Sequence, residues 1–288
     1  MGSEMCIRDS WYTELIRAQE WVTDGKENGW FNGYYDNHGR QVEGCIDNNV
    51  RMMLTGQVFS IMGNVADDTQ IAAITKSADT YLYKKEVGGY RLNTDFKEEK
   101  FDLGRMFGFA YGEKENGAVF SHMTVMYANA LYQRGFVKEG YKALYTLLEQ
   151  AMDTPVSLMY PGIPEYFDAE GKGKYPYLTG AASWYMMTMV TQIFGFRGAW
   201  GDLVLEPKIL LQQFDGSNTY SAQFPFRGQT YALVYQNPDQ KEYGEYQIAE
   251  VWLDGQRYAV EEKTSVRIPF AELEKKDTHT PVSYTHLT

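Results

Sequence analysis

Residues 118–152, with the sequence AVFSHMTVMYANALYQRGFVKEGYKALYTLLEQAM, decide the fold class of this chain. Apolar side chains recur at helical spacing over residues 118–134, and Gly135 ends that pattern. A second run with the same spacing covers residues 137–152. The stretch therefore predicts two successive long helices.

Similar helical patterns lie on both sides of this stretch. They cover residues 11–23, 49–62, 67–82 and 179–194. The segments between them are irregular and rich in glycine or proline, as in residues 84–117 and 153–178. Long helices that alternate with such loops are typical of an α/α toroid, in which the loops gather at one end and build a pocket.

The sequence changes character after about residue 199. Short runs rich in aromatic and β-branched residues cover residues 203–205, 220–226, 229–235, 247–253 and 258–260. Asp254-Gly255 predicts a hairpin between two of them, because a type I′ turn needs positive φ at both central residues. Residues 200–276 are therefore predicted to form an antiparallel β-sandwich.

The two ends of the chain do not share these patterns. Residues 1–10, MGSEMCIRDS, and residues 281–288, PVSYTHLT, look like translated sequencing-adapter sequence. Ordinary frayed termini are the alternative. We assign residues 1–10 to a non-native leader and residues 277–288 to a non-native tail, and we expect the chain to be a fragment of a larger enzyme.

The composition excludes several classes of protein. The 288 residues include 27 Lys and Arg against 38 Asp and Glu, a formal net charge of −11. An acidic chain without a basic run is a poor partner for nucleic acid, and no apolar stretch is long enough to span a membrane. Two cysteines make neither a disulfide framework nor a metal site. Aromatic residues reach 15%, and rings with a polar edge suit stacking on sugars.

The densest polar cluster covers residues 111–122. A loop that holds Lys114 and Glu115 runs into an apolar helix, and His122 lies on the first turns of that helix. These residues are therefore candidates to approach one ligand. The alternative is an ordinary solvated loop followed by a core histidine that has found a hydrogen-bond partner.

Two further clusters are candidates for binding. In residues 177–184, Thr179 is a good N-cap and Gly180 leaves room at a helix N-terminus, which favours an anion; the alternative is a cap with tight helix packing. Residues 160–167 place Glu165 among aromatic rings in a proline-stiffened loop, which is otherwise an ordinary surface loop.

Taken in order, these segments resemble one family. LGRMFGFAYGEKENGAVFSH, YPGIPEYF, YLTGAASW and GDLVLEPK, within residues 103–208, are similar to the C-terminal half of glycoside hydrolase family 94, the inverting β-glucoside phosphorylases. The resemblance covers about residues 11–235 and implies an (α/α)6 barrel followed by a β-sandwich. Residues 11–199 would form the C-terminal part of the catalytic barrel.

The resemblance also implies roles for individual residues. Lys114 corresponds to a residue that contacts the acceptor sugar, and Glu115 to one that binds the transferred glycosyl unit. His122 corresponds to a histidine that binds inorganic phosphate, and Thr179 with Gly180 to a pair that holds the same phosphate. Glu165 and Tyr166 fall where the family has sugar-contacting residues.

The implied reaction breaks a β-linked gluco-oligosaccharide with phosphate to give α-glucose 1-phosphate. An inverting hydrolase needs two carboxylates, whereas a phosphorylase needs one acid because phosphate is the nucleophile. The family's acid is an Asp in a segment similar to GDWND, which this chain lacks. We therefore expect the catalytic acid to lie upstream of this fragment and the fragment alone to be inactive.

Two alternatives remain at this point. One is an inverting glycoside hydrolase on the same toroid, and the other is a catalytically silent carbohydrate-binding module, such as the phosphorylase-like part of a glucan synthase. The resemblance implies no metal or organic cofactor, with phosphate as co-substrate, and a homodimeric full-length enzyme. Scarce cysteine and the intracellular use of sugar phosphates favour the cytoplasm. The linkage that is cut and the acceptor stay open.

Overall fold

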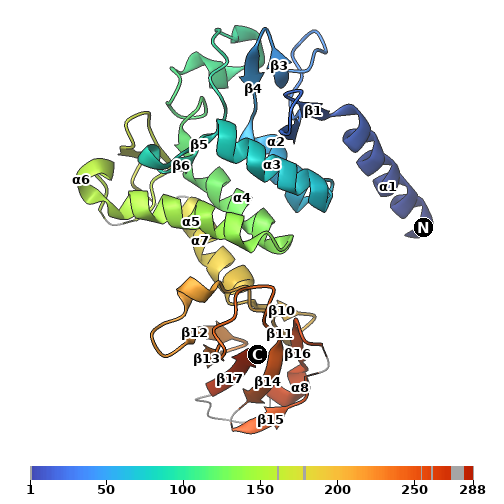
Figure 1. The fold of residues 1–288 in the computed structure, drawn as a ribbon, viewed down its shortest axis with the longest axis vertical. Helices are drawn as coiled ribbons and strands as arrows, with labels where there is room; N and C mark the ends of the chain where they lie inside the picture. The colour runs from blue at the N-terminus through green and yellow to red at the C-terminus, as the bar shows by residue number, and fades with distance from the viewer. Residues whose placement is uncertain are drawn as a thin grey trace. The chain divides into compact units, whose positions relative to one another are not determined.

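The computed structural model describes residues 2–160, 162–177, 180–253, 255–260, 262–273 and 282–287. The chain divides into two compact units, Met1–Tyr185 and Met186–Thr288. The first is mainly helical with short sheets, and the second is mainly β (Figure 1). None of the described helices has the length and apolar character needed to cross a membrane.

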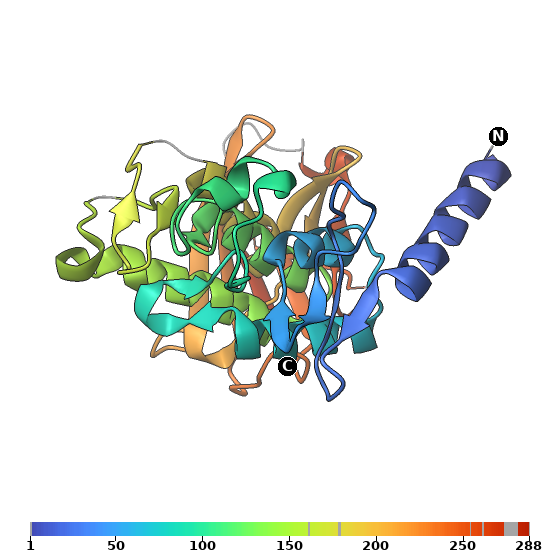
Figure 2. The same cartoon turned by 90° about the horizontal axis from the view of Figure 1, so that it is seen from above.

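Helices make up most of the first unit. They are α1 (Gly2–Gln19), α2 (Leu54–Met62), α3 (Asp68–Tyr81), α4 (Ser121–Gln133), α5 (Val137–Met152), α6 (Thr154–Ser157) and α7 (Gly180–Thr188), which runs into the second unit. In Figures 1 and 2, α4 and α5 lie side by side. The prediction of a helix over residues 137–152 is confirmed to the residue.

The two helices of this pair differ in burial. On α4 most side chains are inaccessible, including Val125, Tyr127 and Leu131 at 0% exposure. On α5 the buried side chains, such as Leu144 and Leu147, share one face. Helix α4 is therefore an inner element and α5 an outer one. This two-layer order agrees with a helical family domain, while the complete barrel stays a prediction.

Helix α3 begins where its sequence predicts. The Asp67 carboxylate accepts a hydrogen bond from the Gln70 backbone N–H at 2.8 Å, and the Gln70 side chain accepts one from the Asp67 N–H at 3.2 Å. This capping box satisfies two donors that a helix start otherwise leaves unpaired.

Four predicted helices differ from the structure at one end: three of them begin or end as a strand, and one continues as a π-helix. Residues 21–23 form β1 (Trp21–Thr23), which pairs with β2 (Gly29–Phe31), and residues 49–51 form β4 (Asn49–Arg51), which pairs with β3 (Gly44–Ile46). Residues 119–120 form β7 (Val119–Phe120) ahead of α4. Pairing with other strands overrides local helical spacing in each case. After α7 the chain continues as a π-helix, η4 (Met189–Ile193).

Short irregular elements complete the first unit. They are β5 (Tyr83–Lys84), β6 (Gly89–Tyr90), β8 (Tyr166–Phe167), β9 (Gly173–Lys174) and the 3₁₀ turns η1 (Lys85–Val87), η2 (Phe101–Leu103) and η3 (Arg105–Gly108). Strands β7, β8 and β9 form one antiparallel sheet that ties the loop after α6 to the start of α4. This sheet positions the candidate site.

The second unit contains two sheets. One has the order β10-β11-β16 and the other β12-β13-β17-β14-β15. Their strands are β10 (Phe196–Ala199), β11 (Asp202–Leu205), β12 (Thr219–Phe226), β13 (Gln229–Gln236), β14 (Ile248–Leu253), β15 (Gln256–Tyr258), β16 (Val266–Ile268) and β17 (Val282–Leu287), with short helices η5 (Leu211–Gln213) and α8 (Phe270–Leu273). The predicted β14–β15 hairpin is confirmed, with Leu253 opposite Gln256.

The strand pairs β10–β11, β11–β16, β12–β13 and β14–β15 are antiparallel, as predicted for this region. Strand β17 comes from the segment that the sequence analysis assigns to a tail, and it runs parallel to β13 and antiparallel to β14. Its assignment as a non-native tail stays a prediction, as does the sandwich packing of the sheets.

Candidate functional site

Two buried asparagines hold the loop that carries Lys114 and Glu115. Asn93 is inaccessible, and its side chain accepts a hydrogen bond from the Gly117 N–H at 2.7 Å and donates one to the Asn116 side chain at 3.1 Å. Asn116 in turn donates to the Phe109 carbonyl at 2.8 Å. Buried amides that use both ends in this way fix the loop conformation.

Gly117 is required at its place in this loop. Its φ is +76°, and a Cβ there would lie 2.2 Å from the Tyr111 ring. The Tyr111 hydroxyl donates to the Asn93 carbonyl at 3.2 Å, which keeps the ring against the glycine. The KENG sequence thus ends in a tightly packed turn at Gly117.

The Lys114 ammonium lies between two aromatic rings. It is 4.8 Å from the ring centroid of Tyr175 and 5.3 Å from that of Phe109. The Tyr175 hydroxyl raises the pKa of Lys114, so this side chain stays charged. Lys114 is therefore in contact with the loop that precedes α7, although 60 residues separate it from Tyr175 in the chain.

Glu115 presents one oxygen to a cation and leaves the other unpaired. Its Oε1 lies 3.5 Å from Nη2 of Arg105, at the outer limit of a hydrogen bond. Its Oε2 is buried and has no hydrogen-bond partner in the described part of the chain. The carboxylate therefore retains acceptor capacity for a ligand.

The β7–β8 pairing brings the third cluster to the same place. The Ser121 N–H donates to the Glu165 carbonyl at 2.9 Å, and Tyr166 lies opposite Phe120 with the two rings stacked 6.3 Å apart. Tyr166 is 4% exposed, and its hydroxyl donates to Glu113 at 3.4 Å. Burial, with Glu113 nearby, raises the pKa of Tyr166. The Glu165 side chain is half-buried.

His122 packs against the start of α7. A Cβ built on Gly180 would lie 2.7 Å from Cε1 and 2.9 Å from Nδ1 of His122, so a larger residue there would require the imidazole to move. The ring also packs on Trp184, with centroids 5.8 Å apart. Thr179, the other residue expected to hold phosphate, lies outside the described residues, as does Leu178.

The imidazole is not a satisfied core histidine. Its Nε2 is buried without a hydrogen-bond partner among the described residues, and burial alone lowers the pKa of His122. Ser121 Oγ beside it and Oε2 of Glu115 are unpaired in the same way. Buried polar atoms normally have partners, so these three atoms retain hydrogen-bonding capacity that the described residues do not use.

The sequence did not identify several residues of this arrangement. Asn93 precedes the motif by more than 20 residues and carries no local signal, and Tyr175 and Phe109 are ordinary aromatics in loops. Trp184 belongs to the YLTGAASW segment, but its position there indicates no role. Only the folded structure identifies these residues as part of the site.

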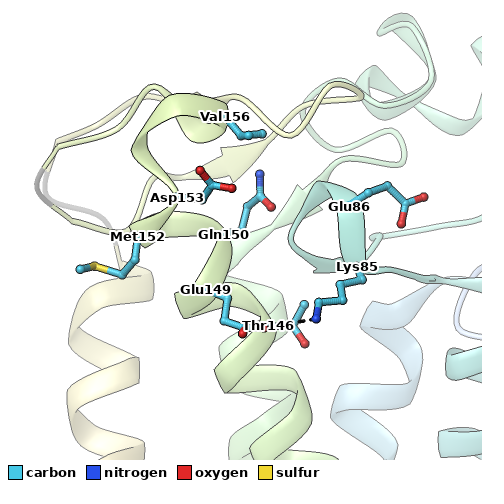
Figure 3. Close-up of a pocket in the computed structure, with 8 residues that line it drawn as sticks. All are labelled: Lys85, Glu86, Thr146, Glu149, Gln150, Met152, Asp153 and Val156. Atoms are coloured by element: carbon cyan, nitrogen blue, oxygen red, sulfur yellow. Dashed lines mark ion pairs between the residues drawn. The ribbon is translucent and has the colours of Figure 1, made fainter.

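A pocket of about 920 Å³ lies elsewhere in the first unit. Figure 3 shows it at the C-terminal end of α5, where the side chains of Lys85 and Glu149 extend toward each other at 3.8 Å. None of the predicted site residues lines it. In the part of the chain that the structure describes, no group of three or more His, Cys, Asp or Glu could hold a metal ion.

Comparison with known proteins identifies the family of this chain. The catalytic-domain model of the glycosyl hydrolase 94 superfamily matches residues 10–195. Solabiose phosphorylase from Paenibacillus borealis is 22% identical over 253 residues, which cover 85% of this chain and 32% of that protein. Cellobionic acid phosphorylase from Neurospora crassa is 24% identical over 211 residues, with 68% and 26% covered.

A third relative is N,N'-diacetylchitobiose phosphorylase from Vibrio proteolyticus, 23% identical over 222 residues, which cover 74% of this chain and 27% of that protein. The chain thus spans at most about a third of the length of these relatives. The family match extends over more than half of the chain and includes the KENG loop, His122 and Gly180. This chain belongs to the glycosyl hydrolase 94 superfamily.

Proposed function

We propose that the chain forms the phosphate-binding and sugar-binding part of an inverting glycoside phosphorylase. In the proposed reaction a phosphate oxygen attacks the anomeric carbon of a β-linked glucoside and forms α-glucose 1-phosphate. The glycosidic C–O bond breaks, and the leaving oxygen takes a proton from a general acid. None of the residues named here is proposed as that general acid.

The single observation that carries this proposal is that Glu115, Ser121 and His122 each have a buried polar atom without a hydrogen-bond partner among the described residues. An imidazole that lies against the first residue of α7 is well placed to share an anion with the free N–H groups of that helix start. We assign the phosphate to His122 and Gly180 on this basis, and to Thr179 because the family resemblance implies it.

The charge around His122 also favours an anion over a hydrolytic base. Burial alone accounts for its lowered pKa, and no carboxylate contributes to the shift. A hydrolase would need a base carboxylate at this position to activate water. A neighbouring carboxylate would instead raise the pKa of the histidine and repel phosphate.

The sugar side of the proposal rests on the loop next to this position. Lys114 and Glu115 would bind the acceptor and the transferred glycosyl unit, because one carries an available cation and the other an unpaired acceptor oxygen. Glu165 would add a polar contact. Tyr166 is buried, so it would act chiefly by holding Glu113 and supporting Tyr175, 6.0 Å away.

The relatives do not decide the acceptor. Their names specify solabiose, cellobionic acid and N,N'-diacetylchitobiose, which are chemically different sugars. The resemblance further implies a homodimer of the full-length enzyme, and light scattering of the full-length enzyme tests that part of the proposal.

Phosphate binding by the full 288-residue chain tests the proposal directly. In spectra of histidine-labelled protein, inorganic phosphate and glucose 1-phosphate should shift the His122 ring signals saturably. Signals of the exposed His38 should not move. A His122→Asn variant should lose the saturable response. If phosphate leaves the His122 signals unchanged, or shifts those of His122 and His38 alike, the proposed function is contradicted.

A further inference from the structure

Two hairpin turns of the second unit carry a large side chain where a small one is usual. Strands β10 and β11 are joined by Trp200-Gly201, and strands β12 and β13 by Arg227-Gly228. Trp200 has φ +55° and Arg227 has φ +51°. Two-residue turns with positive φ favour Asn, Asp or Gly at these positions. The turn geometry therefore does not account for an indole and a guanidinium there.

The Trp200 indole is almost completely exposed. It is 98% accessible, the highest value among the large apolar side chains of the described chain. A tryptophan usually gains stability by removing much of its ring surface from water. Here the folded unit leaves both the apolar faces and the polar N–H edge of the ring available to a ligand.

The Arg227 guanidinium lies beside this turn. A Cβ built on Gly201 would lie 3.3 Å from Nη1 of Arg227, and the guanidinium carbon is 3.7 Å from the ring centroid of Phe270. The ring therefore supports the guanidinium by cation–π attraction. Among the described residues, no carboxylate oxygen lies within 4.0 Å of Arg227, and its guanidinium donates no hydrogen bond. Its N–H donors are therefore available.

A pocket of about 430 Å³ adjoins the same turn. Asp202 and Arg267 line it and form an ion pair at 2.7 Å. Arg267 also donates a hydrogen bond at 3.3 Å to the carbonyl of Ala199, the residue before Trp200. Polar side chains elsewhere in the lining are those of Tyr258, Glu262 and Ser265. The volume is within the range of about 300–1,000 Å³ that is usual for small-molecule sites.

We propose that Trp200, Arg227 and this pocket form an oligosaccharide-binding site on the second unit, in addition to the candidate site of the first unit. One sugar ring would stack its C–H face on the indole, and its hydroxyl groups would accept hydrogen bonds from Arg227. The charges of this surface balance, because Asp202 and Glu262 offset its two arginines. The surface therefore favours a neutral polar ligand over an anion.

The indole N–H signals of the full chain with isotope-labelled tryptophan provide the test. Cellotetraose, laminaritetraose and maltotetraose are neutral probes that differ in linkage. We expect at least one of them to shift the Trp200 signal saturably, while the signal of Trp11, which is 55% exposed, stays in place. If none of the three shifts the Trp200 signal, or if Trp11 shifts equally, the inference is overturned.

Arg227→Gln keeps the Trp200 reporter and removes the cation. It should weaken tetrasaccharide binding by about fivefold, the value of one net hydrogen bond. Arg257→Gln is the matched control, since Arg257 belongs to the same unit, is 63% exposed and pairs with Glu250 at 2.9 Å. Its affinity should change by less than about twofold, because an exposed ion pair contributes little.

Two results with these variants would overturn the inference. They are an unchanged affinity in Arg227→Gln and an equal loss in Arg257→Gln. A Trp200 signal that moves with protein concentration in the absence of sugar, and not with any tetrasaccharide, would also overturn it. That result would assign the surface to self-association.

The outcome is separable from that of the proposed function. Trp184 packs on His122, so its indole signal reports on the candidate site. A tetrasaccharide that shifts Trp200 and leaves Trp184 in place occupies the second unit alone. If phosphate shifts the His122 signals but no tetrasaccharide shifts Trp200, only this inference is rejected. If a tetrasaccharide shifts Trp200 but phosphate leaves His122 unchanged, the second site stands and the phosphorylase assignment fails.

Discussion

The start of α2 and the start of α4 differ in whether their buried polar groups have hydrogen-bond partners. Ahead of α2, the carboxylate of Glu43 accepts hydrogen bonds from the Gly33 N–H at 2.8 Å and the Met53 N–H at 2.7 Å. Ahead of α4, no side chain caps the helix, and Ser121 Oγ and His122 Nε2 are buried without partners in the described chain.

We interpret this difference as one between a structural junction and the proposed binding site. Glu43 is 2% exposed, and both of its oxygens are used within the protein, so it needs no ligand. The unpaired atoms at α4 cost free energy as long as they lack a partner, and a bound polar ligand would remove that cost. A buried polar group therefore indicates function here only where the fold leaves it unsatisfied.

The largest expected effect on stability is at Glu43, in the junction ahead of α2. Glu43→Ala removes both acceptors and leaves two buried N–H groups unpaired, each of which costs about 1–3 kcal/mol. We expect the free energy of unfolding to fall by about 4 kcal/mol, measured by urea denaturation at about pH 6.5. A loss below about 1 kcal/mol would mean that Glu43 is not the structural acceptor described here.

The pH dependence of stability should follow the same residue. Burial raises the pKa of Glu43 from 4.5 to about 8, so the folded state binds this proton more tightly than the unfolded state. The stabilisation is complete below pH 4.5 and is lost as the pH rises toward 8. The slope approaches about 1.4 kcal/mol per pH unit. Urea midpoints between about pH 5 and 8 should decline in the parent chain and flatten in Glu43→Gln.

His122 should contribute with the opposite sign and less strongly. Its folded-state pKa is lowered, so its contribution is present above pH 6.5 and is lost as the pH falls. Denaturation of His122→Asn across the same range checks this. If the change of the urea midpoint with pH persisted in Glu43→Gln and disappeared in His122→Asn, then His122 and not Glu43 would control the pH dependence of stability. That result would reverse the comparison.

At the proposed phosphate site around His122, the expected effect is on ligand affinity. A hydrogen bond to a charged group contributes about 1.5–3 kcal/mol, so His122→Ala should weaken phosphate binding by about 10- to 150-fold. Its free energy of unfolding should change much less than that of Glu43→Ala. Calorimetric titration with phosphate gives the affinity, and unchanged affinity would count against the phosphate site.

The smallest effect is expected at Ser121. Because its hydroxyl has no partner among the described residues, Ser121→Ala should change the free energy of unfolding by less than about 0.5 kcal/mol, or raise it slightly. A loss above about 1 kcal/mol would show that the hydroxyl is paired in the protein, and the contrast with Glu43 would then weaken.

The comparison also shows how far the sequence could predict the site. The motifs predict binding roles for Lys114, Glu115, His122 and Gly180, which stay predictions, and the structure brings His122 against Gly180. Asn93 and Tyr175 were not identifiable, because their roles depend on partners that lie 23 and 61 positions away in the chain. Spacing along a chain carries no information on such pairs.

The sequence by itself determined the elements whose stability is local. The apolar face of residues 137–152, the Asp67 capping box and the β14–β15 hairpin follow from spacing, caps and turn residues within a few positions. The family motifs were equally local. These features depend on interactions that neighbouring residues make with one another.

The tertiary structure decided the rest. Residues 49–51 and 119–120 became strands because other segments paired with them, and the tail took a parallel register beside β13. It also decided that the Glu43 carboxyl group has hydrogen-bond partners and that His122 Nε2 has none among the described residues. Both outcomes depend on groups from other parts of the chain. Burial and long-range hydrogen bonding are properties of the folded chain, and no local pattern encodes them.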